Sequence, residues 1–431
     1  MSRVILSTPV ITPRRHRLAG TGYRFDTLLL GSLIILLGVG LVMTGSASTS
    51  IAERQTGQPF YYLWRQALFV GIGLLAGWAV LRTRLVYWEK AGPVLLVAGF
   101  LLLIVVLVPG VGRAVNGASR WLPLGVFNLQ ASEPAKLFAI VFIAGYLVRH
   151  REAIRSRVLE FLKPVGVVGA LAVLLLLEPD FGAAVVILAT VLGMMFLARV
   201  RFWHFGMLLL LFSATFVALA VSSPYRLERL TTFINPWADP FASGFQLTQA
   251  LIAFGRGEWF GVGLGASIQK MSYLPEAHTD FLFAVLAEEL GLIASLIVIV
   301  LFGIVLWRAF VVGSRARQAG NHFAGYLAYG IGLWIGLQAF INIGVNMGVL
   351  PTKGLTLPLM SYGGSSIIIT CIACALLLRA DHETRSPVER ERTARAPRQE
   401  LRQEPYFRPQ DERPRWRDTR FSATRRKGRA W

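Results

Sequence analysis

Charged residues are scarce in this chain of 431 residues. Only 16% are Asp, Glu, Lys or Arg, whereas 54% are hydrophobic, and the mean hydropathy is +0.55. Because a soluble domain carries about 25% charged residues, this composition excludes an ordinary soluble protein. It predicts a membrane protein.

Cysteine and histidine are also rare. The chain has 2 cysteines and 6 histidines. It contains no HExxH pair, which argues against a zinc enzyme, and no GxxxxGK[ST] loop of a nucleotide-binding protein. Cys371 and Cys374 form a CxxC inside an apolar run. That spacing permits a redox pair or a metal site, but we interpret the two residues as small hydrophobes on one helix face.

Long apolar runs dominate the sequence. About 20 apolar residues cross the hydrocarbon core of a bilayer, which is about 30 Å thick. Ten runs come close to that length, near residues 27–46, 66–82, 91–108, 133–148, 165–178, 182–198, 203–221, 280–307, 323–345 and 364–379. We therefore predict an all-α membrane protein with ten transmembrane helices.

The positive charge is unevenly distributed along the chain. Lys and Arg number 44 against 24 Asp and Glu, a net charge of +20. If the ten spans alternate, 34 of the 44 basic residues fall on one side of the membrane. Basic residues favour the cytoplasmic side, which places both termini in the cytoplasm. Because the positive-inside bias explains the excess of basic residues, the net charge does not indicate binding to nucleic acid, and we expect no nucleic acid partner.

Composition divides the chain into three parts, namely a basic cytoplasmic segment 1–24, a membrane domain 25–380 and a tail 381–431. The first apolar run follows about 24 polar, Arg-rich residues and lacks a small-residue cleavage site, so we expect that helix to be retained. The tail is rich in Arg, Pro, Glu and Gln, and we expect it to be disordered. Its basic residues either contact anionic lipid or are simply solvated.

Three segments on the outer side are long enough to form structure: 109–132, 222–279 and 346–363. The second lies between spans seven and eight and is the longest connection, which usually indicates function. Its apolar, glycine-punctuated part, 250–270, predicts a short helix at the membrane interface.

One predicted span is short. Only about 14 apolar residues separate Pro164 from Glu178, or about 21 Å of helix. We therefore expect Glu178, Pro179 and Asp180 to lie below the outer surface.

Another span carries a polar stripe. Gln338, Asn342 and Asn346 follow one another at i, i+4 spacing on an apolar helix. Such stripes often bond a neighbouring helix, and we interpret this one as structural.

A set of charged residues falls on the outer side, against the positive-inside bias. The basic members are Arg54, Arg65, Arg113, Arg120, Lys136, Arg226, Arg229, Arg256, Lys270 and Lys353; the acidic members are Glu133, Glu178, Asp180, Glu276 and Asp280. They either form ion pairs that pin loops together or line a cavity that binds a substrate. Cations facing a compartment without ATP favour a lipid diphosphate as that substrate. The segment SYGGSS (361–366) adds free N–H groups at a helix start, although a plain helix cap explains it equally well.

Two acidic residues near helices have alternative interpretations. Glu133 and Lys136 share a helix face, so they either pair or hold an anionic ligand together. Glu288 lies inside an apolar run and is either a hydrogen-bonded core carboxyl, which we favour, or part of a proton relay.

Four blocks of sequence resemble a known family. They are GASRWLPLGVFNLQASEPAKL (117–137), EPDFG (178–182), LPEAHTDFLFAVLAEELG (274–291) and NMGVLPTKGLTLPLMSYGGSS (346–366). These blocks are similar to the signature motifs of the SEDS family, the shape, elongation, division and sporulation proteins. The resemblance covers residues from about 25 to 380, and the last block is closer to the division branch than to the elongation branch.

The resemblance implies a peptidoglycan glycosyltransferase that polymerises lipid II into β-1,4-linked glycan strands. It implies a place in the bacterial inner membrane at the division septum, with the active site facing the periplasm. The implied partners are the class B penicillin-binding protein FtsI and the divisome membrane proteins FtsQ, FtsL, FtsB and FtsN. The family's essential carboxylate in the HTDF block corresponds to Asp280.

This reaction requires a base for the attacking sugar hydroxyl and cations for the departing diphosphate. We assign the base to Asp280 and the cations to Arg120, Lys136, Lys270 and Lys353. The other predicted substrate-binding residues are Trp121, Glu133, Asp180, His278 and Ser361. Trp121 either stacks on the sugar or lies at the membrane interface, and we favour the interface. No cofactor is implied with certainty; a divalent cation such as Mg²⁺ on the diphosphate is compatible with the carboxylates, with its ligands unknown.

Two rival functions remain open at the level of sequence. A lipid II flippase also needs about ten spans and a polar cavity, although the outer position of the charges argues against alternating access. A scaffold that recruits the penicillin-binding protein needs the same charges only for structure.

Overall fold

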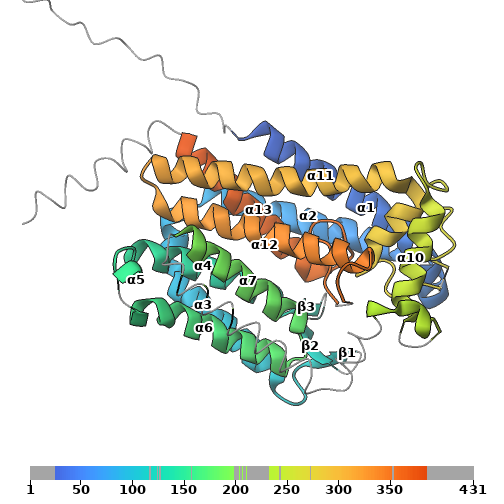
Figure 1. The fold of residues 1–431 in the computed structure, drawn as a ribbon, viewed down its shortest axis with the longest axis horizontal. Helices are drawn as coiled ribbons and strands as arrows, with labels where there is room; N and C mark the ends of the chain where they lie inside the picture. Colours follow the sequence, from blue (N-terminus) through green and yellow to red (C-terminus); the bar gives the residue numbers. More distant parts are fainter. Residues whose placement is uncertain are drawn as a thin grey trace, which may run out of the picture.

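The computed structural model describes residues 25–385 except 116–117, 124, 126–127, 157, 199–202, 204–205, 207–209, 211–232, 242–243, 272 and 352–353. Its described part is built mainly of α-helices (Figure 1). Seven of these helices are long and apolar enough to cross a membrane: α1 (Thr27–Thr56), α2 (Tyr61–Arg82), α3 (Leu85–Leu107), α6 (Val158–Leu177), α11 (Leu282–Gln318), α12 (His322–Asn346) and α13 (Gly364–Arg385). The chain is a multi-pass membrane protein.

Two shorter helices coincide with further predicted spans. They are α4 (Ser132–Arg149) and α7 (Phe181–Leu197). The 17 residues of α7 are apolar, whereas α4 contains three charged residues among 18. The predicted run 203–221 lies almost wholly outside the described residues. The remaining nine runs correspond to helices, and the count of ten spans stays a prediction.

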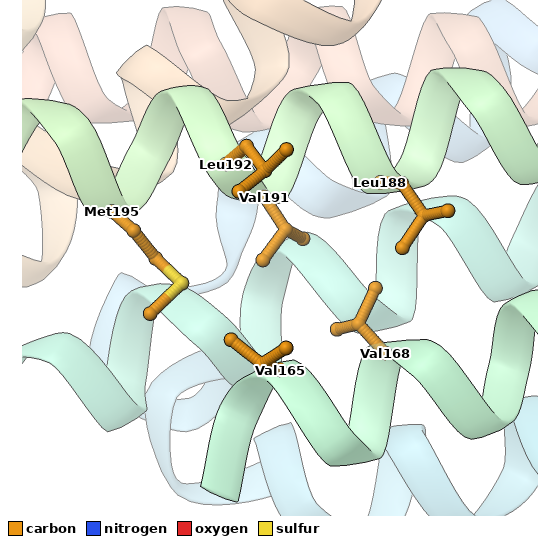
Figure 2. A pocket seen from close by; sticks show the side chains of 6 residues that line it. All are labelled: Val165, Val168, Leu188, Val191, Leu192 and Met195. Carbon is orange, nitrogen blue, oxygen red and sulfur yellow. The ribbon is translucent and has the colours of Figure 1, made fainter. Parts of the chain in front are cut away.

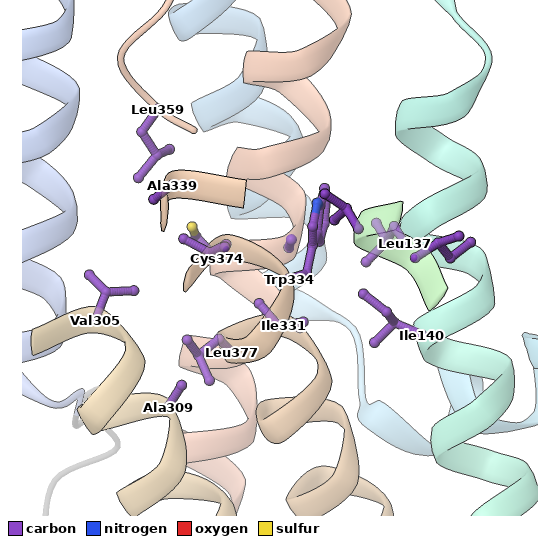
Figure 3. Packing of buried hydrophobic residues seen from close by; sticks show 14 of the residues in the cluster. Leu137, Ile140, Val305, Ala309, Ile331, Trp334, Ala339, Leu359, Cys374 and Leu377 are labelled. Atoms are coloured by element: carbon purple, nitrogen blue, oxygen red, sulfur yellow. The ribbon is translucent and has the colours of Figure 1, made fainter. Parts of the chain in front are cut away.

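The core of the bundle forms around α12. This helix packs against α11, α13, α7 and α4, and α13 packs in turn against α2. Among the described spans, 72% of the best membrane window of α12 and 78% of that of α13 are buried, against 28% for α2 and α3. Figure 3 shows Trp334 and Ile331 of α12 between Leu137 and Ile140 of α4 and Leu377 of α13. The polar stripe of α12 is therefore buried inside the protein and does not face lipid.

Helix α11 is broken near its N-terminal end. Gly291 has φ 78° and ψ −175°, and its neighbours bond to an outer segment instead of continuing the helical ladder. The N–H groups of Val262 and Gly263 donate to the carbonyls of Glu288 and Glu289 at 2.9 and 3.0 Å. In return, the N–H of Leu292 donates to the carbonyl of Glu258 at 2.9 Å. Residues 258–263 thus occupy the break and tie the outer loop to the membrane helix.

Glycine makes this contact possible. A Cβ on Gly291 would lie 2.4 Å from the nitrogen of Gly261, and a Cβ on Gly257 would lie 1.9 Å from the Ala287 oxygen. Both distances are shorter than non-bonded atoms tolerate, so the two backbones approach only because side chains are missing there.

Four local predictions differ from the structure. The outer segment 109–132 contains a three-stranded antiparallel sheet, β1 (Arg113–Val115), β2 (Ala118–Pro123) and β3 (Asn128–Gln130), so the fold is not purely α. The helix in the segment 250–270 is α10, which spans Phe245–Gly257 and ends before most of that segment. The last helix continues to Arg385, so residues 381–385 belong to α13 and not to the tail. The fourth difference concerns α6.

Helix α6 is not short. It begins at Val158 and contains Pro164 in its interior, which gives 20 residues, or about 30 Å. Pro164 lies in the second turn, so the prediction that the span starts there is wrong. Glu178 and Asp180 are nevertheless buried, so their burial comes from packing and not from a short span.

Candidate active site

Two asparagines of α12 hold the backbone of Asp280, which lies in the turn before α11. The Nδ2 groups of Asn342 and Asn346 donate to the carbonyl oxygen of Asp280 at 2.8 and 2.9 Å. Both asparagines are buried, whereas the Asp280 residue is half-buried. The predicted base is therefore anchored through its main chain by groups from a different helix.

The loop after residue 353 approaches the same carboxylate. A Cβ on Gly354 would lie 3.2 Å from Oδ2 of Asp280, so this glycine leaves room for the acid. One residue further, the carbonyl of Leu355 accepts a second hydrogen bond from Asn342. Lys353, a predicted diphosphate ligand, directly precedes Gly354 in sequence but lies outside the described residues.

Lys136 is enclosed among three side chains. Its Nζ lies 2.9 Å from Oε1 of Glu133 and 2.8 Å from Oε1 of Gln338, and 5.1 Å from the centre of the Trp334 ring. The side chain is only 1% exposed. The structure thus contains the ion pair that was one of the two alternatives for Glu133 and Lys136, and contact between Lys136 and an external anion requires movement of the surrounding residues.

Gln338 connects this pair to the loop beside Asp280. Its Nε2 donates to the carbonyl of Thr356 at 3.0 Å, while its Oε1 accepts from Lys136 and from Nε1 of Trp334. The hydroxyl of Thr356 lies 3.3 Å from that of Ser366 at the start of α13. Residues 354–357 therefore contact α12 and α13 beside Asp280.

Asp180 stabilises the start of α7. Its Oδ1 accepts the N–H of Ala183 at 3.1 Å, and its Oδ2 accepts hydrogen bonds from Ser132 at 3.0 Å and Gln130 at 3.2 Å. The same first turn of α7 packs on the loop beside Asp280, since a Cβ on Gly182 would lie 2.7 Å from Cγ of Leu355. Asp180 thus fixes a helix end next to this loop.

Arg120 and Trp121 lie in β2, next to the α6–α7 connection. The guanidinium of Arg120 donates to the carbonyls of Glu178, at 3.2 Å, and Pro179. Trp121 is half-buried and pairs with Arg113 and Gln130 in the sheet. Both residues therefore shape the outer loops.

Glu178 is a buried acid beside Arg120. Neither carboxyl oxygen has a hydrogen-bond partner among the described residues. Burial, reinforced by the Asp180 carboxylate, raises the pKa of Glu178 to about 8, and the Arg120 guanidinium opposes the rise. The Glu178 carboxyl is therefore mainly protonated at neutral pH.

His278 belongs to an aromatic cluster at the start of α2, and Ser361 directly precedes Tyr362 of the same cluster. The ring of His278 lies 5.0 Å from Tyr62 and 5.5 Å from Tyr362, and its carbonyl accepts the N–H of Tyr362 at 2.9 Å. Burial lowers the pKa of His278, against the opposing effect of Glu276. The hydroxyl of Ser361 accepts the N–H of Leu357 at 2.8 Å, so it closes the loop on itself.

Lys270 belongs to a separate buried cluster near the break in α11. Its Nζ lies 2.7 Å from Oε1 of Glu289 and 3.0 Å from the hydroxyl of Ser46 in α1. The adjacent Glu288 is fully buried and accepts hydrogen bonds from Arg256 at 2.9 Å and from Ser267. The interpretation of Glu288 as a hydrogen-bonded core carboxyl is confirmed.

The polar stripe of α12, Gln338, Asn342 and Asn346, therefore connects Asp280, residues 354–357 and the ion pair of Lys136. Asp180 is connected to the same loop because α7 packs on Leu355. Arg120, His278 and Ser361 hold neighbouring loops, and Lys270 holds a different one. Sequence reasoning missed Gln338, Asn342 and Asn346 as parts of the site, although their i, i+4 spacing was a usable signal. It also missed Ser46 and Glu289, for which spacing in the sequence gives no signal.

An apolar pocket lies between α6 and α7 (Figure 2). Its lining residues are Val165, Val168, Leu188, Val191, Leu192 and Met195. None of them carries a polar group, so the pocket is no candidate for a diphosphate. Within the described part of the chain, no three His, Cys, Asp or Glu residues are grouped as metal ligands, and Cys371 and Cys374 are buried free thiols.

The sequence profile of the FtsW/RodA/SpoVE family, described as "Cell cycle protein", matches residues 26–386. The chain belongs to this family. It is 60% identical to the "Probable peptidoglycan glycosyltransferase FtsW" of Nitrosococcus halophilus over 373 residues, which cover 86% of this chain and 96% of that protein. The protein of the same description from Legionella pneumophila is 53% identical, over 84% of this chain and 92% of its own length.

Solved structures share the fold. A chain from a structure described as "Structural coordination of polymerization and crosslinking by a peptidoglycan synthase complex" matches with a TM-score of 0.68 and 30% identity, over 84% of this chain and 99% of that one. The rod shape determining protein RodA of Thermus thermophilus matches with a TM-score of 0.61 and 27% identity, over 84% and 98%.

Proposed function

We propose that this protein is a peptidoglycan glycosyltransferase that polymerises lipid II into β-1,4 glycan strands during septal wall synthesis. One observation carries the proposal: Asp280, half-buried, is anchored by two buried amides beside a glycine loop. The family and the names of the curated relatives support the reaction, and the Asp280 carboxylate supplies the base that the reaction needs.

The chemistry is a single in-line displacement. A hydroxyl oxygen of the acceptor sugar attacks the anomeric carbon of the donor, and the bond from that carbon to the diphosphate oxygen breaks. Asp280 accepts the hydroxyl proton as the new bond forms, which typically contributes about 10² to 10⁴ in rate. The diphosphate leaves with the electron pair of the broken bond, and nearby cations stabilise its charge.

We rank the four predicted cations by their neighbours in sequence and structure. Lys353 directly precedes Gly354, where a Cβ would lie 3.2 Å from Oδ2 of Asp280, so we take it as the first choice for contact with the diphosphate. Arg120 is half-buried and comes second. Lys136 is enclosed with Glu133, and Lys270 is paired with Glu289, so both contribute mainly to structure in this conformation.

The remaining assignments follow from the family and the charge distribution. We infer ten spans, with both termini in the cytoplasm, a large periplasmic loop between spans seven and eight, and a location at the division septum. The penicillin-binding protein FtsI is the proposed crosslinking partner, with FtsQ, FtsL, FtsB and FtsN as further partners. A divalent cation such as Mg²⁺ would be held by carboxylate oxygens such as those of Asp280 and would neutralise charge on the substrate diphosphate.

Polymerisation of lipid II by the purified protein in detergent, with and without FtsI, tests the function. Wild type should form glycan strands, whereas Asp280→Asn should form none while it stays folded and binds FtsI. Strand formation in detergent excludes a pure flippase, since no bilayer is crossed. Full activity of Asp280→Asn would refute the role of the acid. Synthesis that survives removal of every outer charge would instead favour a scaffold.

A further inference from the structure

The start of α11 and the loop beside it are both held by α12. Asn342 and Asn346 have four amide hydrogens, and contacts account for all of them. Asn342 donates to the carbonyls of Asp280 and Leu355, and Asn346 donates to the carbonyls of Asp280, at 2.9 Å, and Asn342, at 2.8 Å. The Asp280 carbonyl oxygen thus uses both of its lone pairs.

The acceptor side of Asn346 is used as well. Its Oδ1 accepts the N–H of Ala284 at 3.0 Å. Ala284 lies in the first turn of α11, and its N–H also lies 3.1 Å from the carbonyl oxygen of Phe281, so this amide is shared between Asn346 and the residue just before the helix. Asn346 therefore fixes the helix start on both sides, through the carbonyl before it and through an amide inside it.

Asn342 connects the two parts of the site. Its Nδ2 group donates both to the carbonyl of Asp280, which carries the carboxylate, and to the carbonyl of Leu355 in the loop 354–357. One turn earlier on α12, Gln338 bonds the same loop at Thr356. The separation between the Asp280 carboxylate and this loop is thus set by side chains of α12, a helix that the core surrounds on several sides.

We propose that Asn342 and Asn346 are positioning residues of the glycosyl transfer reaction. They fix the Asp280 carboxylate relative to residues 354–357, so that the acid reaches the attacking hydroxyl while the diphosphate lies against the loop. This proposal rests on the proposed function, because it gives Asp280 the role of base. Neither amide side chain contacts the reacting atoms, so neither is catalytic in its own right.

Steady-state polymerisation by Asn342→Ser and Asn346→Ser, with lipid II as substrate, tests the proposal. Because a misplacement of about 1 Å can cost about 10²-fold in rate, we expect kcat to fall by about that factor while the KM for lipid II changes less than about threefold. The pH profile of kcat should also shift, because the environment of the carboxylate changes.

Asn321→Ala is the matched control. Asn321 caps the opposite end of α12, where its Oδ1 accepts the N–H of Ala324 at 3.1 Å, far along the helix from Asp280. Its loss should lower the thermal stability of the protein and leave kcat and the pH profile unchanged. A purely structural role of Asn342 and Asn346 predicts the same behaviour for all three variants.

Asp280→Glu supplies an independent measurement. The longer Glu side chain moves the carboxylate relative to a fixed backbone. The single variant Asp280→Glu should therefore be less active than wild type. If Asn342 and Asn346 fix that backbone, the fold-loss of kcat in the double variant Asn346→Ser/Asp280→Glu should differ from the product of the two single losses. Multiplicative effects would contradict the proposal.

Three results would overturn positioning: unchanged kcat in both serine variants, a loss of kcat matched by Asn321→Ala, or failure of every Asn342 and Asn346 variant to fold while Asn321→Ala folds. Asp280→Asn, measured in parallel, separates this proposal from the function itself. An active Asp280→Asn refutes the base. An inactive Asp280→Asn together with fully active serine variants refutes only the positioning.

Discussion

The Nζ of Lys136 in α4 lies 2.8 Å from Oε1 of Gln338 in α12, two residues that are 202 positions apart in the sequence. This bond joins the ion pair of Lys136 and Glu133 to the polar stripe that also holds Asp280. Lys136, Glu133 and Asp280 are thus linked through one buried helix and are not independent surface groups.

Removal of Lys136 should destabilise the protein. Lys136→Met leaves the buried carboxylate of Glu133 without its cation, and breaking a buried pair on one side costs about 3–5 kcal/mol. The double variant Lys136→Met/Glu133→Leu removes both charges and should recover most of that loss. Thermal unfolding in detergent measures both effects. If the double variant is as unstable as the single one, the pair is not what Lys136 contributes to stability.

Lipid II binding by the same two variants addresses the other role of Lys136. If only the pair matters, the stable double variant should bind labelled lipid II like wild type. Weaker binding by a variant that has regained stability would show contact with the diphosphate.

Substitution of Lys270 should affect folding and spare substrate binding. Lys270→Met leaves the fully buried Glu289 carboxylate with the hydroxyl of Ser46 in α1 as its hydrogen-bond donor among the described residues, so we expect a loss of about 3–5 kcal/mol. Lys163→Met is the control, because Lys163 is 52% exposed in its pair with Glu160 and should cost less than about 1 kcal/mol. Unfolding curves and lipid II titration give the two readouts. A large loss of affinity in Lys270→Met would return Lys270 to the set of diphosphate ligands.

Glu178 should make stability depend on pH. Its pKa is about 8 in the folded protein and near 4.5 when unfolded, so between these values the folded state retains a proton that the unfolded state has released. Stability then falls as the pH rises through this window. Glu178→Gln, which cannot ionise, should remove that fall and unfold at a higher temperature than wild type at pH 8.5. Glu276→Gln, at an exposed loop position, serves as control. Parallel pH profiles of wild type and Glu178→Gln would contradict the prediction.

The break in α11 should require glycine. Gly291→Ala places a Cβ 2.4 Å from the Gly261 nitrogen at a φ of 78°, so we expect a loss of more than about 1 kcal/mol and a displaced outer loop. Gly303→Ala in the same helix meets nothing within 4 Å and should be neutral or stabilising by about 0.5–1 kcal/mol. Thermal unfolding and protease cleavage within residues 258–271 measure the two effects. Equal stability of the two variants would show that the break tolerates a side chain.

The sequence by itself determined the membrane class, the place of nine helices and the family. Hydrophobic runs of about 20 residues are set by the thickness of the bilayer, a constraint that acts on each segment separately and can therefore be seen in one dimension. The motif around Asp280 was visible for a similar reason, because a carboxylate beside an apolar run is costly without a function.

Only the tertiary structure decided which charges meet. Lys136 and Gln338, Lys270 and Ser46, and Asn342 and Asp280 come from segments that are far apart in the chain, and their pairing depends on how the helices pack. The break at Gly291 also escaped sequence reasoning, because the hydrogen bonds that replace the helical ladder come from residues about thirty positions earlier. Burial selects such partners by distance in space, since a polar group removed from water must find whichever donor or acceptor the fold brings to it.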